Sequence, residues 1–369
     1  MIEEKHRLSL IWLVLGVLLA GLGFVHPTHA TSPDSVHYLR MATDFRTYDG
    51  AFPPGYPFLI AFISYLTQLP VLWASKLVNW LALGVSGVCW ARRIGSGRAA
   101  GLLALWLLPG ALRVAAYTWS ETVFVVLLLE VVWQAHSVWY WQGNTTDSGW
   151  ASVQLAGLAV ALIMVRYVGL FVLIGLAGLI IGYQPKGSLG TRMLGRANAN
   201  RRGLTWALLG AGVGVGLLLV FNYTSTGHWV GGPRLAPTDP WPQLLKITAL
   251  GFANEVFLYN YRPGVNWVGF GLAILMQGSV CLFLYRNLNR RFRWPPITSL
   301  ATWMAATGLL YWLILITLRI LSPFDPLTER LMMPGSHCVL VAVVLALGQS
   351  QHSMMSKSPE RAEIRTNPS

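Results

Sequence analysis

The chain has 369 residues, of which 54% are hydrophobic and only 11% are charged. Soluble proteins carry about 25% charged residues, so this composition excludes a water-soluble enzyme. The 17 Trp residues and the mean hydropathy of +0.52 exclude a disordered chain. A net charge of +13 would indicate nucleic-acid binding in a soluble protein, but membrane proteins collect basic residues in cytoplasmic loops. We therefore expect an all-α polytopic membrane protein.

The first apolar run spans residues 8–25 and follows the basic residues Lys5 and Arg7. About 20 apolar residues are needed to cross a bilayer as a helix, so this run predicts a first membrane helix with a cytoplasmic N-terminus. A signal peptide cleaved after Ala30 is the alternative, because the residues before it form an acceptable cleavage site. The many later apolar segments favour a retained helix.

Further apolar segments bring the expected number of membrane-spanning helices to about ten. They are 71–91, 99–116, 119–139, 151–165, 167–183, 204–221, 264–285, 299–318 and 335–349. As one straight helix, the stretch 151–183 would be about 50 Å long, against a hydrocarbon core of about 30 Å. We therefore expect two short crossings with a break at Arg166.

With this hairpin, most basic residues fall on one side of the membrane. They are Lys5, Arg7, Arg92, Arg93, Arg98, Lys186, Arg192, Arg196, Arg201, Arg202, Arg286, Arg290, Arg291, Arg293, Lys357, Arg361 and Arg365. The positive-inside rule then puts both termini in the cytoplasm of a multi-pass plasma (inner) membrane protein. Residues 1–349 are expected to form one transmembrane domain, and the polar residues 350–369 a disordered cytoplasmic tail.

A long outer loop follows the first span, from residue 26 to about residue 70. Ser32 can cap a helix that has Pro33 at its first position. Apolar residues then recur on one face at a spacing of three, as an interfacial helix requires: Val36, Leu39, Ala42 and Phe45. A Pro-rich turn at 52–57 precedes a second short apolar helix. Loops of this length are usually functional or disordered, and the composition here is not that of a disordered segment.

The remaining basic residues map to the outer half of the expected bundle. They are Arg40, Arg46, Lys76, Arg113, Arg166, Arg234, Lys246, Arg262, Arg319 and Arg330. Arg113, Arg166 and Arg319 lie at the ends of apolar spans, where ionisable side chains usually face a cavity or a partner. A group of guanidinium groups at such a rim suits a phosphate, because each offers paired donors to anionic oxygens. For any one of them taken singly, an arginine that extends to lipid headgroups is the alternative.

Asp34 lies in the first turn of the expected interfacial helix and permits two interpretations. A carboxylate at this position is stabilised by the helix dipole and needs no chemical role. Alternatively, a carboxylate held at the membrane boundary beside a cavity can take a proton from an attacking hydroxyl. Sequence spacing alone leaves both interpretations open.

Short motifs in a fixed order cover most of the chain. They are PDSVHYLRMA, FPPGYPFLIAF, ARRIGSGR, WSETVF, RYVGL, FNYTSTGHWVGGPR and RILSPFDPLTERLMMP. In type and order they resemble the GT-C superfamily of membrane glycosyltransferases, in particular the glycosyltransferase family 39 or protein-mannosyltransferase-like branch. The resemblance implies transfer of one sugar, hexosyl or pentosyl, from a polyprenyl-phosphate donor on the extracytoplasmic face, with inversion at the anomeric carbon. The acceptor would be a hydroxyl of a glycan, a lipid or a protein.

The resemblance also implies roles for individual residues. Asp34 matches the acidic residue of the first outer loop and is expected to be the general base, and Glu121, in the WSET motif, a second acid near the acceptor or the donor sugar. The expected substrate-binding residues are His37, Tyr38, Arg166, Arg234, Arg319 and Arg330. Many relatives carry two adjacent acids in the first loop, whereas Ser35 follows Asp34 here, which weakens the case for a second base or metal ligand. Larger relatives have a soluble outer domain, so acceptor recognition is expected here from the loops 26–70 and 222–263.

The sequence demands no cofactor. A divalent cation near Asp34 and Glu121 is left open, although no ligand spacing argues for one. Two other functions also stay open: a transporter or lipid flippase that uses Glu130 as a proton relay, and an inactive scaffold with the same fold. Nucleic-acid binding is not expected, because topology already explains the basic loops and no other basic stripe is interleaved with aromatic residues.

Overall fold

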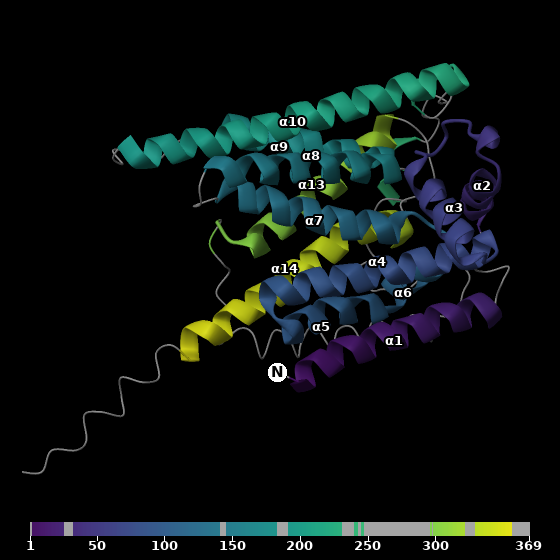
Figure 1. The fold of residues 1–369 in the computed structure, drawn as a ribbon, viewed down its shortest axis with the longest axis horizontal. Helices are drawn as coiled ribbons and strands as arrows, with labels where there is room; N and C mark the ends of the chain where they lie inside the picture. Colours follow the sequence, from purple (N-terminus) through teal and green to yellow (C-terminus); the bar gives the residue numbers. More distant parts are fainter. Residues whose placement is uncertain are drawn as a thin grey trace, which may run out of the picture.

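The structure, a computed structural model, describes residues 2–25, 32–140, 145–182, 191–230, 240–242, 245–246, 296, 298–321 and 329–355. Within these ranges every regular element is a helix, and the long helices run side by side as an elongated bundle (Figure 1). The all-α architecture predicted from composition and periodicity is therefore confirmed.

Among the described residues, six helices are long and apolar enough to cross a membrane. They are α1 (Ile2–Val25), α4 (Val71–Ile94), α7 (Glu121–Trp139), α10 (Thr191–Thr226), α13 (Leu300–Leu321) and α14 (Glu329–Met355). Apolar helices of this length identify an integral membrane protein. The expected total of about ten spans stays a prediction, because the segment 264–285 lies outside the described residues.

The expected span 99–116 is not one straight helix. It is divided into α5 (Ser96–Ala104), a 3₁₀ turn and α6 (Pro109–Ala116), and the two parts are bent by 79°. Pro109 opens α6, and because proline has no N–H to donate to the preceding turn, a helix cannot run through this position undisturbed. If the bent pair crosses as one unit, it forms a seventh span.

The break expected at Arg166 is present. It separates α8 (Thr145–Val165) from the 3₁₀ turn η3 (Tyr167–Leu170) and α9 (Phe171–Gly182). Gln134 near the end of α7 donates to the carbonyl of Ala151 early in α8 (3.1 Å), and α9 runs back along α7 until Gly182 lies beside Trp139. The chain therefore reverses its direction at Arg166.

The long described helices run from one end of the bundle to the other (Figure 1). Glu121 begins α7 at the first end, and Trp139 closes it at the second, where the Trp139 carbonyl accepts a hydrogen bond from Asn200 in α10 (2.9 Å). The last turn of α4, with Arg92 and Arg93, lies at the second end too. Arg92 and Arg93, which topology predicts to be cytoplasmic, are thus at the opposite end from Glu121.

A reciprocal pair of tryptophans fixes α1 against α4. The indole rings of Trp12 and Trp80 are stacked 4.1 Å apart with an interplanar angle of 1°. Trp12 Nε1 donates to the carbonyl of Trp80 (3.1 Å), and Trp80 Nε1 donates to the carbonyl of Trp12 (2.9 Å). Each ring lies over a glycine of the other helix, because a Cβ at Gly16 or Gly84 would come within 3 Å of the facing indole. Only glycine leaves room for this contact.

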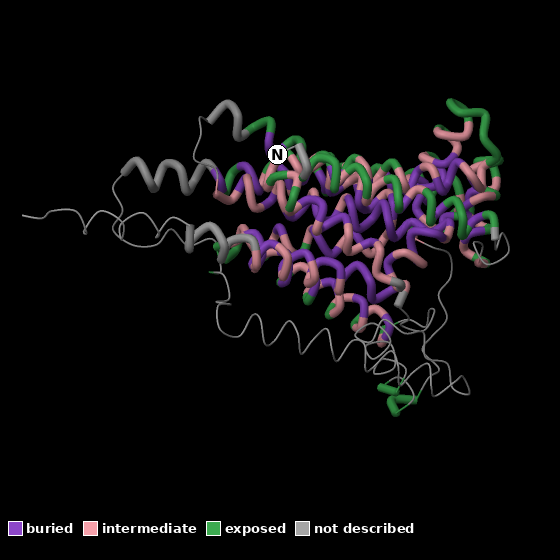
Figure 2. Tube along the Cα trace, turned by 90° about the horizontal axis from the view of Figure 1, so that it is seen from below, coloured by how far each residue is buried: buried purple, intermediate pink, exposed green. Residues whose placement is uncertain are grey.

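The first outer loop forms the helices that its sequence predicts. They are α2 (Pro33–Thr43) and α3 (Gly55–Thr67), which lie across the end of the bundle to which Glu121 belongs (Figure 1). On the apolar face of α2, Val36 is exposed and Leu39 and Ala42 are partly buried, whereas Ser35, Tyr38 and Met41 on the other side are buried. Buried residues otherwise follow the inside of the bundle along its length (Figure 2).

The last helix is longer than expected. α14 runs to Met355, past the predicted domain boundary at 349, so the first residues of the predicted disordered tail are helical. Gln and Met are good helix formers, and polar residues can continue a helix beyond the membrane. The rest of the tail, from residue 356, lies outside the described residues.

Candidate active site at the loop end of the bundle

Asp34 is presented by the capped first turn of α2. Ser32 is the N-cap, and its Oγ accepts hydrogen bonds from the backbone N–H of Ser35 (3.2 Å) and from Trp119 Nε1 (2.7 Å). The cap thereby ties the start of α2 to the turn that precedes α7. Asp34 keeps 22% of its side chain exposed, so its carboxylate is reachable from outside.

Glu121 is the buried centre of the site. It is the first residue of α7, its side chain is fully buried, and its Oε1 forms ion pairs with both Arg166 and Arg330. A buried carboxylate is costly unless it is paired, so the two guanidinium groups account for its position. Oε2 makes no hydrogen bond to the described residues.

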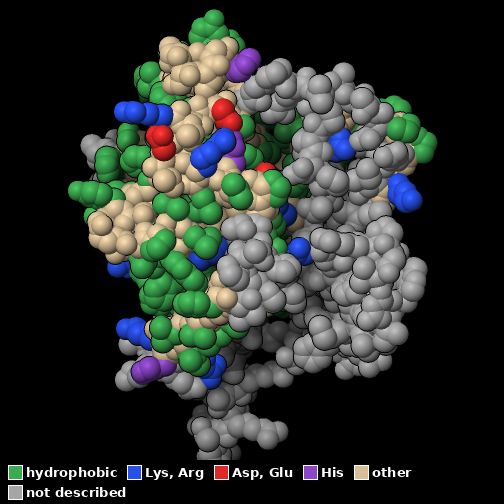
Figure 3. Space-filling view, turned by 90° about the vertical axis from the view of Figure 1, so that its right-hand side faces the viewer, with side chains coloured by type: hydrophobic (Ala, Val, Ile, Leu, Met, Phe, Trp, Pro, Cys, Tyr) green, Lys and Arg blue, Asp and Glu red, His purple; other side chains and the backbone are tan. Residues whose placement is uncertain are grey.

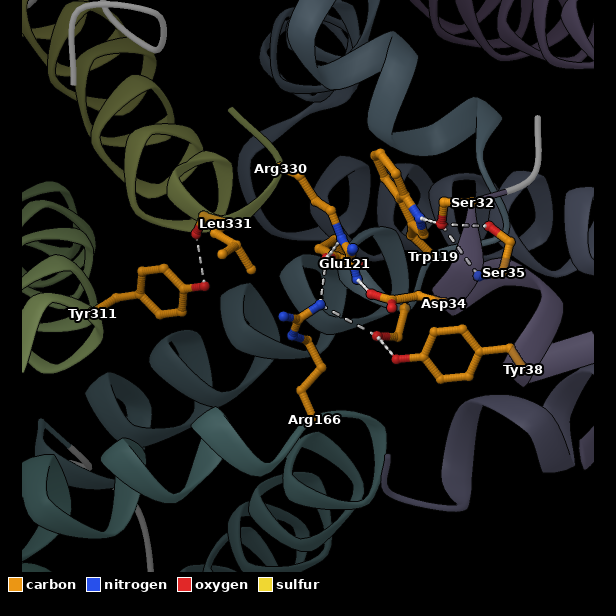
Figure 4. A network of polar contacts seen from close by, with 11 residues as sticks. Ser32, Asp34, Ser35, Tyr38, Trp119, Glu121, Arg166, Tyr311, Arg330 and Leu331 are labelled. Atoms are coloured by element: carbon orange, nitrogen blue, oxygen red, sulfur yellow. Dashed lines mark hydrogen bonds and ion pairs between the residues drawn. The ribbon is translucent and has the colours of Figure 1, made fainter. Parts of the chain in front are cut away.

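Arg330 joins the two carboxylates. It lies in the first turn of α14, where its Nε donates to Glu121 Oε1 (2.6 Å) and its Nη2 lies 2.5 Å from Asp34 Oδ2. The guanidinium also stacks over the ring of Trp119, 4.6 Å from the centroid. Figure 4 shows Asp34, Glu121, Arg166 and Arg330 pointing toward one another from α2, α7, the α8–α9 turn and α14. The structure thus brings together four of the residues that the sequence selected.

Tyr38 completes the inner wall of this cluster. Its side chain is buried, its OH lies 3.0 Å from Ser120 Oγ, and Arg166 Nη1 donates to the same hydroxyl oxygen of Ser120 (3.4 Å). Burial raises the pKa of Tyr38 above its usual value of 10.0. The phenol is therefore a neutral hydrogen-bonding group at the edge of the charged cluster.

Three polar residues of α4, not selected from the sequence as site residues, hold the turn that carries Trp119 and Ser120. Ser75 Oγ lies 2.8 Å from Thr118 Oγ1, Lys76 Nζ donates to the same Thr118 oxygen (3.0 Å), and Asn79 donates to the carbonyls of Ala115 and Tyr117 (2.9 and 3.2 Å). Their positions in the sequence could have indicated this role, because polar residues inside an apolar membrane span usually have a partner.

His37, by contrast, belongs to a different group. Its Nε2 lies 3.1 Å from Asp49 Oδ1, and its Nδ1 lies 3.3 Å from an Arg40 nitrogen. This group faces the surface, because Arg40 and Asp49 are about half exposed. Charged and His side chains gather among apolar ones on this end of the molecule (Figure 3). His37 is therefore placed on the outer side of α2, and Tyr38 on the inner side.

Two other arginines were expected in the site. Arg319 is buried in the last turn of α13, at the same end of the bundle. Arg234 lies outside the described residues.

The carboxylates of the site do not fit a divalent cation as arranged. Calcium and magnesium need several oxygen ligands around one point, but the described ranges contain no group of three or more His, Cys, Asp or Glu residues. Arg330 lies between Asp34 and Glu121 and already compensates both charges. A guanidinium thus occupies the place that a shared metal ion would need.

Glu130, the residue considered for a transporter, is paired within the bundle. Arg93 binds both of its oxygens (2.8 and 2.5 Å), and the guanidinium lies over the rings of Trp133 and Trp90, 4.8 and 5.5 Å from their centroids. A bidentate pair that is also held by two aromatic rings is a rigid contact between α4 and α7. This geometry favours a structural role for Glu130 over a proton relay.

No protein-family model and no curated protein matches the sequence. The chain is similar to two solved structures. The crystal structure of ArnT from Cupriavidus metallidurans bound to undecaprenyl phosphate has a TM-score of 0.51 and 16% sequence identity, over 96% of this chain and 62% of ArnT. The apo structure of the same protein has a TM-score of 0.44 and 17% identity, over 92% and 62%.

At this level of identity the likeness concerns the fold. The chain has an ArnT-like polytopic fold. It spans less than two thirds of the length of ArnT.

Proposed function

We propose that the protein is a membrane glycosyltransferase that moves one sugar from a polyprenyl-phosphate donor to an acceptor hydroxyl. The carrying observation is the convergence of a reachable carboxylate, Asp34, with the guanidinium groups of Arg166 and Arg330 at one end of an apolar bundle. Support comes from the fold shared with ArnT, a GT-C glycosyltransferase that has been solved with undecaprenyl phosphate.

The proposed reaction is a single displacement. Asp34 takes the proton of the acceptor hydroxyl while its oxygen attacks the anomeric carbon, and the bond from that carbon to the phosphate oxygen breaks. The polyprenyl phosphate leaves as an anion without needing a proton, because Arg166 and Arg330 stabilise its charge. Attack from the side opposite the leaving group inverts the anomeric configuration.

Arg330 links donor binding to the proposed base. Its Nη2 is paired with one carboxylate oxygen of Asp34. A donor phosphate competes for the same guanidinium, so binding of the donor would free Asp34 for proton transfer. Glu121, which is buried and touches both arginines, would act as a positioning residue for them.

The sidedness of the site is part of the proposal. Arg92, Arg93 and the first residues of α10 lie at the end of the bundle opposite Glu121. Because basic residues favour the cytoplasmic side, the site would face the extracytoplasmic side of the plasma membrane, with both termini in the cytoplasm. The acceptor would then approach from the outer surface, which α2 and α3 cover.

The decisive experiment is a transfer assay in lipid nanodiscs. Purified wild-type protein and the Asp34→Asn variant are incubated with radiolabelled polyprenyl-phosphate sugars and a membrane extract as the source of acceptor. We expect label transfer by the wild type and a loss of about 10²- to 10⁴-fold in Asp34→Asn, as is typical for removal of a general base.

Asp44→Asn is the matched control. Asp44 caps the 3₁₀ turn that follows α2 through the backbone N–H of Arg46 (3.0 Å), and asparagine can make the same cap. This variant should transfer label like the wild type. No transfer by folded wild-type protein with any of these donors, or full activity in Asp34→Asn, would contradict the proposal.

A further inference from the structure

A buried amide, that of Asn222, joins three segments of the chain at the loop end of the bundle. Asn222 lies four residues before the end of α10, and its side chain is fully buried. Its Oδ1 accepts a hydrogen bond from the OH of Tyr48 (2.5 Å), and its Nδ2 donates to the OH of Tyr167 (3.0 Å) and to the carbonyl of Trp229 (2.9 Å). The OH of Tyr167 in turn donates to the carbonyl of Gly50 (3.0 Å). The amide oxygen and both amide N–H groups therefore have partners, which fixes the orientation of the amide.

The loop between α2 and α3 contacts the chain on both sides of the break at Arg166. Behind the break, Tyr167 donates to Gly50 of this loop. Ahead of the break, Gly55 at the start of α3 lies against the last turn of α8, because a Cβ at Gly55 would lie 2.6 Å from the carbonyl oxygen of Met164. Arg166 itself has an extended backbone (φ −152°, ψ 131°) between two helical elements. The position of its side chain therefore depends on how the turn around it is held.

The helix α2, which carries Asp34, is held at both ends. Before its first residue, the cap Ser32 accepts a hydrogen bond from Trp119 Nε1 (2.7 Å). Beyond its last turn, Tyr48 donates to Asn222 (2.5 Å). The buried amide thus connects the helix of the candidate base with the turn between α8 and α9.

We infer that Asn222 is a positioning residue of the transfer reaction: its amide holds the α2–α3 loop to the turn that follows Arg166 and so sets the position of Asp34 relative to this guanidinium group. The inference rests on the proposed function, in which the base and the cation that stabilises the leaving phosphate act on the same anomeric carbon and must be aligned. Without the link, a donor phosphate would still meet the guanidinium groups of the site, but the base would be poorly aligned. The turnover number kcat should then fall, while the KM for the donor should change little.

The test is a steady-state transfer assay in lipid nanodiscs that measures kcat and the donor KM. Labelled polyprenyl-phosphate sugar is the donor, and a fixed amount of membrane extract supplies the acceptor. The wild type is compared with Tyr167→Phe, which removes the hydroxyl that joins Asn222 to Gly50. Tyr223→Phe is the matched control, because Tyr223 follows Asn222 in α10, is half exposed, stacks on Trp229 and contributes no hydroxyl to this network. The unfolding temperature of each protein is measured in parallel.

We expect Tyr167→Phe to lower kcat about tenfold, with the donor KM within about twofold of the wild-type value. Tyr223→Phe should behave like the wild type. A lower unfolding temperature with unchanged kcat would show that the network only stabilises the fold, and the inference would be wrong. A raised donor KM with unchanged kcat would overturn it as well, because the network would then act on donor binding.

A second variant, Asn222→Ala, removes all three hydrogen bonds of the amide and should lower kcat at least as far as Tyr167→Phe does. If Asn222→Ala fails to fold, the milder Tyr167→Phe variant decides the question. An active wild type whose Tyr167→Phe variant keeps its kcat contradicts the inference and leaves the proposed function standing. A folded wild type that transfers no label contradicts the proposed function, and the inference falls with it.

Discussion

Arg330 lies 2.5 Å from Asp34 and so connects the first turn of α14 to the first turn of α2. The same guanidinium donates to Glu121 and stacks on Trp119. A lysine ammonium is a point charge without the planar fork and cannot make all of these contacts at once. We expect Arg330→Lys to fold but to lose transfer activity by about 10²- to 10³-fold, the range found when one charge-stabilising donor is removed.

Removal of the charge should affect folding as well as activity. In Arg330→Met, Glu121 keeps only Arg166 as a partner, and breaking a buried ion pair typically costs about 3–5 kcal/mol. The double variant Glu121→Gln/Arg330→Met also removes the carboxylate that pairs with Arg166, so it should recover neither the thermal stability, measured by the unfolding temperature in detergent, nor the activity. Recovery of activity in the double variant would contradict the role of Arg330 at the donor phosphate.

Tyr38 should have no part in the pH dependence of the reaction. Burial raises its pKa above the usual 10.0, so the phenol is neutral in the folded protein throughout the range of an ordinary assay. In the unfolded chain Tyr38 would ionise near pH 10, so the raised pKa leaves the free energy of unfolding unchanged below that pH and lowers it above that pH.

Tyr38→Phe removes only the hydrogen bond to Ser120, and we expect a rate loss of about three- to tenfold with the pH–rate profile unchanged in shape. Disappearance of a basic limb from that profile would show that Tyr38 titrates during catalysis.

A variant of Glu130 distinguishes the glycosyltransferase hypothesis from the transporter hypothesis. Because Arg93 binds both of its carboxylate oxygens, Glu130→Gln should lower the free energy of unfolding by about 1.5–3 kcal/mol, as for other hydrogen bonds between charged groups. Transfer of label should stay close to the wild-type rate at a temperature where both proteins are folded. Complete loss of activity in a folded Glu130→Gln protein would instead favour a proton relay through the membrane.

The stacked tryptophans predict that replacing either of the two glycines they cover will destabilise the protein. A Cβ at Gly16 would lie 2.7 Å from Trp80 Nε1, and one at Gly84 would lie 2.6 Å from Trp12 Nε1. Either glycine-to-alanine change must displace an indole, and overpacking of this kind typically costs about 1–3 kcal/mol. Gly21→Ala in the same α1 helix is the control, because its Cβ meets no described atom within 4 Å. Equal unfolding temperatures for Gly16→Ala and Gly21→Ala would show that the ring pair does not set the distance between α1 and α4.

Local rules predicted the elements around the site well. Ser32 and Pro33 are a cap and a first helical residue in any sequence, and α2 begins where they require. The break at Arg166 follows from the thickness of the bilayer, because a helix through 151–183 would be too long for one crossing. The cap depends on a few neighbouring residues, and the break depends on the thickness of the bilayer.

The partners within the site could not be read from the sequence. Arg330 and Asp34 lie near opposite ends of the chain, and nothing local specifies that their side chains meet. The same holds for Trp12 and Trp80, whose rings depend on the approach of two helices. The sequence places Lys76 among the charges of the outer half, but its contact with Thr118 requires the packing of α4 against the turn that precedes α7. Such contacts are fixed by the bundle as a whole.

The position of Arg330 in α14 also determines when the cluster can form during synthesis. Asp34, Glu121 and Arg166 all leave the ribosome well before Arg330, which supplies the link between the two carboxylates. A nascent chain that lacks α14 therefore has its acids but not the cation that connects them. If the cluster is the active site, as we propose, the site is complete only once α14 has entered the membrane, and truncated or partly inserted copies would be inactive.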